Sequence, residues 1–161
     1  MFSFKNIKWT LIFVFGVLFQ SIIVDYLNLL SIKEVRPNFV IIILIFFGFN
    51  FGGVYATIVG FSVGLIQGLG FLGGGFIGLS SLTKSIIGFY FGLFQKSKRK
   101  WNNLFFLLVL LCGCLIHNFL FLYIYTFGSE INIFSMLIKN VLPTSIYTTI
   151  VGMMIFYVFK K

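Results

Sequence analysis

The sequence has few charged residues and very few acids. Only 9% of its 161 residues are charged, whereas a soluble domain of this size has about one quarter. The acids are three, Asp25, Glu34 and Glu130. General acid–base chemistry needs titratable groups held close together, so this scarcity argues against a catalytic pair of carboxylates.

Residues that bind metals or act as nucleophiles are also scarce. The chain has two cysteines and a single histidine, His117, which is too few for a zinc site. Cys112 and Cys114 are too close in the chain to form a disulfide with each other, and no serine, histidine and acid combination has local support as a triad. We therefore expect a non-enzymatic protein without catalytic residues, metal or cofactor.

Apolar residues dominate and are arranged in long runs. Hydrophobic residues make up 60% of the chain and aromatic residues 20%, with a mean hydropathy of +1.10. A membrane helix takes about 20 apolar residues. We expect an all-α, polytopic integral membrane helical bundle, with residues 1–161 as a single membrane domain. The runs predict six transmembrane helices, Trp9–Leu30, Val35–Phe51, Gly53–Leu72, Phe76–Phe94, Leu104–Phe127 and Phe134–Phe159.

The second run is short for a hydrocarbon core about 30 Å thick, and a re-entrant segment there would leave five crossings. Flanking charge decides between these counts, because cytoplasmic loops collect Lys and Arg. With six helices and a cytoplasmic N-terminus, eight basic residues lie inside and two, Lys33 and Arg36, lie outside. Five crossings would place Lys160 and Lys161 outside. We therefore predict a multi-pass protein of the cell inner (cytoplasmic) membrane with both termini in the cytoplasm.

The formal net charge of +9 does not follow a nucleic-acid-binding pattern. The basic residues are scattered over termini and turns and form no patch interleaved with aromatic residues. Orientation in the membrane and anionic lipid headgroups account for the charge. We expect contact with the lipid bilayer and no nucleic-acid partner.

Glycine is concentrated in the middle of the chain, where thirteen of seventeen lie between Gly48 and Gly92. Small residues at every fourth position of a membrane helix leave a groove in which a second backbone can approach closely. We expect these glycines to hold the protein's own helices together, and a partner-binding face on the third or fourth helix is the alternative. The candidate packing residues are Gly52, Ala56, Gly60, Gly64, Gly68, Gly88 and Gly92.

Lys84 is the most informative polar residue, because a cation inside an apolar run is costly and points to function. Asp25 is the only acid inside a predicted helix and is one candidate partner; backbone carbonyls, a lipid phosphate or a partner chain are the others. Alternatively, the lysine stem extends along the helix to water, and Asp25 is a solvated residue at the outer boundary. The stretch from Gly78 to Ser85 resembles a P-loop, but Thr83 stands where that motif requires glycine.

Other polar residues within the predicted helices are few. His117 has no apparent chain of titratable neighbours for a proton relay, so we expect it to hydrogen-bond to another helix. Gln67 is a candidate for a partner or polar site. A solute pocket needs polar groups that converge, and the candidates are sparse: Gln20, Gln67, Asn118 and Tyr147.

Several short motifs together resemble those of one known family. They are Gln20-Ser21 in the first run, Pro37 at the start of the second, Gly60-Phe-Ser-Val-Gly64-Leu65-Ile-Gln67 in the third, Gly78-Leu followed by Gly88 in the fourth, and Leu142-Pro143-Thr144-Ser145-Ile146-Tyr147 near the start of the last. In these motifs, and in its length and number of runs, the chain resembles the rod shape-determining protein MreD. Two positions depart from the family pattern, because Asn38 and Gly68 stand where the family often has an acid.

The resemblance implies a six-helix inner-membrane protein, similar in fold to the substrate-binding subunits of energy-coupling vitamin transporters. It also implies a non-enzymatic scaffold of the bacterial cell-elongation machinery, which acts in cell shape and peptidoglycan synthesis. The implied direct partner is an MreC-like membrane protein, with MreB and the peptidoglycan synthases contacted indirectly. The expected binding surface is the small-residue face of the third or fourth helix, or the outer turns near Arg36 and Glu130.

The alternative function is a subunit that captures a vitamin-sized solute for a membrane transporter. Such subunits resemble each other in carrying Ala-x-x-x-Ala-like small residues on the first helix, where they dock to an energising partner. Here that helix offers only Gly16. The sparse polar groups also argue against a solute pocket, so the scaffold function is favoured over the transporter function. A lipid or polyprenyl carrier flippase has too few intramembrane charges to recommend it.

Overall fold

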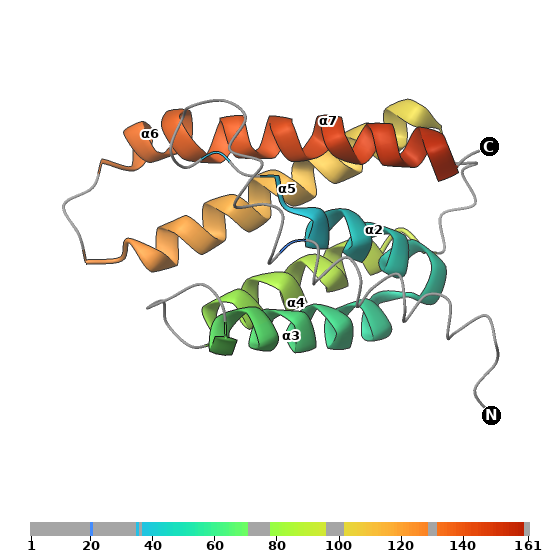
Figure 1. Ribbon diagram of the computed structural model, residues 1–161, viewed down its shortest axis with the longest axis horizontal. Coiled ribbons are helices and arrows are strands. Elements are labelled where there is room, and N and C mark those ends of the chain that lie inside the picture. Colours follow the sequence, from blue (N-terminus) through green and yellow to red (C-terminus); the bar gives the residue numbers. More distant parts are fainter. Residues whose placement is uncertain are drawn as a thin grey trace.

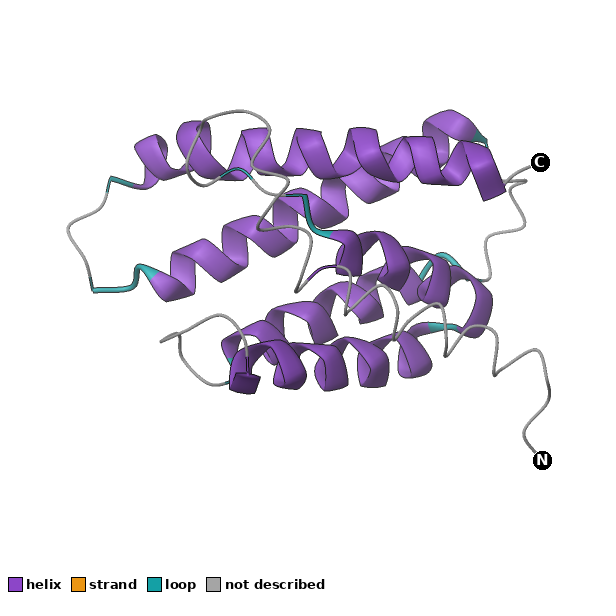
Figure 2. Ribbon diagram, viewed as in Figure 1, coloured by secondary structure: helices purple, strands orange, loops and turns teal. Residues whose placement is uncertain are grey.

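The computed structural model describes residues 20, 35, 37–70, 78–95, 102–128 and 132–159. Within these residues the chain is all-helical, without a strand, which confirms the expected all-α class (Figure 2). The first predicted helix, Trp9–Leu30, lies outside the described residues apart from Gln20. The helices are α2 (Phe39–Phe51), α3 (Gly53–Gly70), α4 (Leu79–Gly92), α5 (Asn103–Tyr125), α6 (Ile133–Met136) and α7 (Leu142–Phe159), with a π-helical turn, Leu137–Val141, before α7.

The helices form a bundle in which α2 and α5 lie between α7 on one side and the α3–α4 pair on the other (Figure 1). α4 packs against α3 and against α5, and α5 in turn packs against α7. α2 lies against both α3 and α4 and also touches α5 and α7. The described helices therefore enclose α2 from several directions.

α2 is apolar along almost its whole length, and most of its residues are buried in the bundle. Its sequence, Phe-Val-Ile-Ile-Ile-Leu-Ile-Phe-Phe-Gly-Phe-Asn-Phe, has no polar face, as expected for a helix inside a bundle. Its 13 residues span about 20 Å, which is less than a hydrocarbon core of about 30 Å. α2 ends at Gly52, whose φ of 89° is unfavourable for other residues, and α3 begins at the next residue.

α3 and α4 pack backbone against backbone. A Cβ added to Gly64 would lie 2.6 Å from the carbonyl carbon of Ser80, and one added to Gly88 would lie 2.6 Å from that of Ala56. A Cβ added to Gly60 would come within 2.8 Å of the α4 backbone. Real Cβ atoms essentially never approach other atoms so closely, so any larger residue would push the two helices apart.

Close packing does not extend over the whole row of small residues. Gly52 was expected to pack as part of the α3 row, but it lies in the turn before α3, where its positive φ is the constraint. A Cβ added to Gly68 would meet only the Gly78 nitrogen, at 3.9 Å, which is an ordinary contact. Gly92, at the other end of α4, lies against Gly53 and Gly52. The tight contact therefore runs from the α2–α3 turn to Gly64.

The contact between α3 and α4 also shows what packs against their small-residue faces. Gly60 and Gly64 of α3 meet the α4 backbone, while Gly88 of α4 meets the α3 backbone at the fully buried Ala56. The two small-residue faces thus cover each other. The expectation that this face of the third or fourth helix binds a partner is therefore wrong for these residues.

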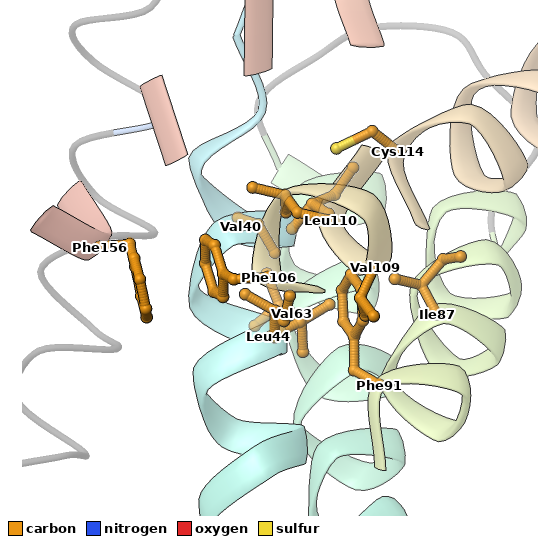
Figure 3. Packing of buried hydrophobic residues seen from close by; sticks show 12 residues of the cluster. Val40, Leu44, Val63, Ile87, Phe91, Phe106, Val109, Leu110, Cys114 and Phe156 are labelled. Carbon is orange, nitrogen blue, oxygen red and sulfur yellow. The ribbon is translucent and has the colours of Figure 1, made fainter. Parts of the chain in front are cut away.

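The apolar core lies where α2, α4, α5 and α7 meet, with Val63 of α3 added to it (Figure 3). The rings of Phe106 in α5 and Phe156 in α7 stack with centroids 4.1 Å apart. Phe91 of α4 points at Gly113 of α5, where an added Cβ would lie 2.5 Å from the ring. A small residue on α5 therefore admits a large ring from α4, as close-packed interiors require.

The last helical stretch runs from Ile133 to Phe159 through a π-helical turn. Pro143 has no N–H and cannot donate to the carbonyl four residues earlier. The π-helical turn just before it adds one residue, and the Leu142 N–H bonds to the Leu137 carbonyl five residues back. The helix therefore continues past the proline, and it already begins at Ile133, ten residues before Pro143.

One described helix, α5, is long and apolar enough to cross a membrane by itself. It has 23 residues and lies within one residue of the predicted start, Leu104. α2 and α3 are shorter apolar helices. The apolar runs thus locate the described helices well, but length and composition together identify only α5 as a full crossing among the described residues.

We predict that Gly64→Ala lowers the stability of the protein and that Gly68→Ala does not. The first change overpacks the α3–α4 contact and should cost about 1–3 kcal/mol. The second adds a methyl group in open space and should be neutral or stabilising, since Ala is a better helix former by about 1 kcal/mol. Thermal unfolding of the purified chain in detergent measures both. Equal melting temperatures for the two variants would contradict the backbone contact.

Candidate functional site

Polar side chains from outside α2 hold its first turn. Pro37 has no N–H, so the first donors that need partners are the N–H groups of Asn38 and Phe39. The Phe39 N–H donates to Gln20 Oε1 at 2.7 Å, and Gln20 Nε2 donates to the Pro37 carbonyl at 3.3 Å. The Asn38 N–H donates to Thr148 Oγ1 at 3.1 Å. The start of α2 is therefore tied both to Gln20 and to α7.

A second set of polar contacts joins α5 to α7. Asn118 Nδ2 donates to Ser145 Oγ at 2.9 Å, and both side chains are buried. The Thr149 hydroxyl donates to the Ser145 carbonyl at 2.7 Å and also lies within hydrogen-bonding reach of the buried Cys114 thiol. Hydrogen bonds between membrane helices are worth about 0.6 kcal/mol on average and up to about 1.7. These contacts therefore hold α7 in register with α5.

His117 is buried beside this set. Its Nδ1 lies 3.1 Å from Asn118 Oδ1, and its ring is nearly parallel to that of Phe121. Its Nε2 is buried and has no hydrogen-bond partner within the described part of the chain. Among the described residues, the partner of His117 therefore lies on α5 itself, and the expected direct bond to another helix is not found there. Asn118 carries the contact on to Ser145 of α7.

Lys84 lies on α4, facing into the bundle. Only 4% of its surface is exposed, so a lysine stem that extends to water does not fit the structure. Its Nζ donates to the Ser80 hydroxyl one turn earlier, and it lies within electrostatic range of His117. Asp25 lies outside the described residues, none of which is acidic. Within the described ranges, the Lys84 charge therefore has no carboxylate partner.

These groups lie at the start of α2, in the first halves of α4 and α7 and in the second half of α5. The hydrogen bonds above connect the α2, α5 and α7 groups, and Lys84 lies beside them through His117. We call this set the polar layer. It consists of Gln20, Ser80, Lys84, His117, Asn118, Ser145, Thr148 and Thr149.

Only part of the polar layer was predicted from the sequence. Lys84, His117, Gln20 and Asn118 were candidates and lie in it. Gln67 is half-buried in α3 and has no hydrogen bond to these residues in the described structure. Thr148 and Thr149 were missed. The available signal was spacing: Thr144 with Thr148 and Ser145 with Thr149 are each four residues apart, which places hydroxyl groups on one side of an apolar helix.

The polar layer can position helices and attract a negative charge. In the described ranges there is no group of three or more His, Cys, Asp or Glu side chains that could hold a metal ion. Its hydroxyl and amide groups mostly bond to one another or to backbone carbonyls. The exceptions in the layer are the Lys84 ammonium, whose partner is a neutral hydroxyl, and His117 Nε2, which has no partner among the described residues. The hydroxyl of Ser81, next to the layer on α4, also has none among them. The arrangement therefore favours binding over bond-making chemistry.

Comparison with known proteins adds one finding to this geometry. The model of the family described as rod shape-determining protein MreD matches residues 2–161, which is essentially the whole chain. No curated protein and no solved structure matches the chain.

We predict that Asn118 and Ser145 stabilise the fold together. Asn118→Ala and Ser145→Ala should each lower the melting temperature, and the double variant should lose less than the sum of the two. The coupling should be about 0.6–1.7 kcal/mol, as for interhelical hydrogen bonds in membranes. A double-mutant cycle by thermal unfolding in detergent measures it, with exposed Cys112→Ala as the control. Additive losses would mean that the two side chains do not interact.

Proposed function

The chain belongs to the family of the rod shape-determining protein MreD, and we propose that it is a non-enzymatic scaffold of the cell-elongation machinery in the inner membrane. The family acts in rod shape determination, consists of membrane proteins and is not a known enzyme family. The observation that carries the proposal is the family match over residues 2–161. A scaffold works through its surfaces, so its inner polar groups should serve mainly to fix its shape.

The direction of the polar side chains supports this proposal. Gln20 and Thr148 bond to the backbone at the start of α2, and Asn118 bonds to Ser145 across two helices. These groups hold helices to one another inside the bundle. The outward faces of α3, α4, α5 and α7 carry large apolar residues such as Ile58, Phe89 and Ile150. Such faces suit contact with lipid tails or with apolar faces of other membrane helices.

We further propose a single membrane domain with six transmembrane helices and both termini in the cytoplasm. α2, α3, α4, α5 and the stretch Ile133–Phe159 would be the second to sixth helices. α2 is short for a crossing, yet a helix can end at membrane depth when its free backbone groups find partners within the protein. Gln20 and Thr148 provide such partners. The distribution of flanking Lys and Arg supports the orientation.

The proposed direct partner is an MreC-like membrane protein, with MreB and the peptidoglycan synthases contacted indirectly. Because α3 and α4 cover each other's small-residue faces, the partner must use other surfaces. The outward helix faces and the outer turns remain, and the turns near Arg36 and Glu130 lie outside the described residues. We place the contact on the outward faces, since these are large, apolar and within the membrane.

The alternative, a solute-capture subunit of a vitamin-type transporter, receives less support. Two of its four candidate polar groups, Gln20 and Asn118, bond to other parts of the protein. Gln67 lies half-buried in α3 and is not among the bonded polar groups of the bundle. A solute pocket would need several such groups free and convergent.

We predict that a reporter fused after Lys161 behaves as cytoplasmic. Eight of the basic residues flank helix ends on the cytoplasmic side in the six-helix arrangement, which requires an even number of crossings. A reporter that is active only outside the cytoplasm should be silent there and active when inserted near Glu130. A strong signal at Lys161 from an intact fusion would contradict six crossings.

We predict that depletion of the protein in its own host gives rounded or widened cells. Wall synthesis would no longer be held along the cell length, while uptake of vitamins should be unchanged. Cell shape by microscopy and growth on vitamin-limited medium measure the two arms. His117→Ala, Cys112→Ala and Cys114→Ala should restore shape when expressed in the depleted strain, provided that they fold. Normal shape together with a specific vitamin requirement would reject the scaffold and favour the transporter.

A further inference from the structure

The first two turns of α4 carry buried polar groups that have no negatively charged partner among the described residues. Ser81 is 1% exposed and Lys84 is 4% exposed, so neither side chain reaches water. The Ser81 hydroxyl has no hydrogen-bond partner in the described structure. In the described structure Lys84 has one hydrogen-bond partner, the Ser80 hydroxyl, which is neutral. A buried ammonium without a negative partner is unfavourable, so an anion bound at this end of α4 would be stabilising.

The three side chains lie on one side of α4. At 3.6 residues per turn, Lys84 falls about 40° from Ser80 and about 60° from Ser81 around the helix axis. Side chains of a helix lean toward its N-terminus, and the bond to Ser80 shows that Lys84 does so. The ammonium therefore lies at the level of the first turn of α4, close to the end of the helix.

The N-terminus of α4 also favours an anion. α4 begins after Gly78, whose residue type provides no side-chain cap for the first N–H groups. Free N–H groups at a helix N-terminus and the helix dipole both favour an anion. Ser80 and Ser81 are themselves first-turn residues, so hydroxyl donors, backbone donors and a cation are grouped within one turn.

We propose that this end of α4 binds a phosphate group, held by Lys84, Ser80, Ser81 and the first turn of the helix. A phosphate offers several acceptor oxygens and so can use the ammonium and both hydroxyl groups together. The site is unrelated to a P-loop, because no strand precedes it and Thr83 replaces the required glycine. The phosphate can come from a lipid headgroup or from a soluble phosphate, and the two sources differ only in whether acyl chains are needed.

The test uses the full chain, purified in a phosphate-free maltoside detergent, with three probes. Dioctanoyl phosphatidic acid supplies a phosphate on two short chains, dioctanoylglycerol supplies the chains alone, and inorganic phosphate supplies the anion alone. Native mass spectrometry and the shift in melting temperature report binding. We expect the phosphatidic acid to bind at least about tenfold more tightly than dioctanoylglycerol, since hydrogen bonds to charged groups are worth about 1.5–3 kcal/mol.

Substitutions test whether the phosphate binds at this end of α4. Lys84→Met should weaken phosphatidic acid binding about tenfold or more, and Ser81→Ala about threefold. Lys139→Met is the matched control, because Lys139 is exposed near the start of the last helical stretch, so its loss removes the same charge from another place. It should change binding less than about twofold. If Lys84→Met does not fold, Lys84→Arg should retain binding, and Ser81→Ala decides the test.

The possible results distinguish a lipid phosphate from a soluble phosphate, and some of them would overturn the proposal. Binding of inorganic phosphate that depends on Lys84 assigns a soluble phosphate, whereas binding of phosphatidic acid alone assigns a lipid headgroup. Equal binding of phosphatidic acid and dioctanoylglycerol, with no binding of inorganic phosphate that depends on Lys84, would overturn the proposal, as would equal losses in the Lys84 and Lys139 variants. An unchanged affinity in Lys84→Met would also overturn the proposal, because it would show that Lys84 does not hold the phosphate. None of these results depends on whether the chain binds an MreC-like partner.

Discussion

The close approach of the α3 and α4 backbones is the contact on which the rest of the described bundle depends. Gly60 and Gly64 on one helix and Gly88 on the other allow it, because each lies where a methyl group has no room. The pair forms the surface against which α2 packs. It also orients α4 so that Phe91 reaches Gly113 of α5. In a membrane, where lipid tails compete equally for apolar side chains, such backbone contact is the main source of helix association.

A second constraint comes from polar groups that cannot be left bare inside an apolar protein. The start of α2 is buried in the bundle, and Gln20 and Thr148 supply the partners that its backbone needs. Asn118 and Ser145 satisfy each other between α5 and α7. Most of the polar layer therefore stabilises the arrangement of helices. Lys84 differs, because its neighbours in the described structure are neutral hydroxyls and an imidazole.

The two constraints together decide which surfaces of the described helices are already occupied. The small-residue faces and most polar groups are used within the bundle, so the outward faces of the described helices are mainly apolar. The chain belongs to a family that determines rod shape, and apolar outward faces of this kind are compatible with the scaffold role proposed above. The first turn of α4 is the exception, where charge and hydroxyl groups remain for a ligand.

The sequence alone determined the all-helical class, the positions of the described helices to within a few residues and the family, because apolar runs and glycine spacing are local properties. It could not determine which glycines touch another backbone. Gly52 and Gly68 have the same spacing as Gly60 and Gly64, yet one is a turn residue and the other is open to a methyl group.

Only the tertiary structure decided where the polar side chains find partners. Thr148 lies 110 residues from the Asn38 N–H that it accepts, and no local pattern joins two positions so far apart. His117 was expected to reach another helix, but its neighbour Asn118 makes that contact instead. Composition and spacing report what each helix contains. Partners across the bundle depend on how the helices rotate and pack, and this is a property of the whole fold.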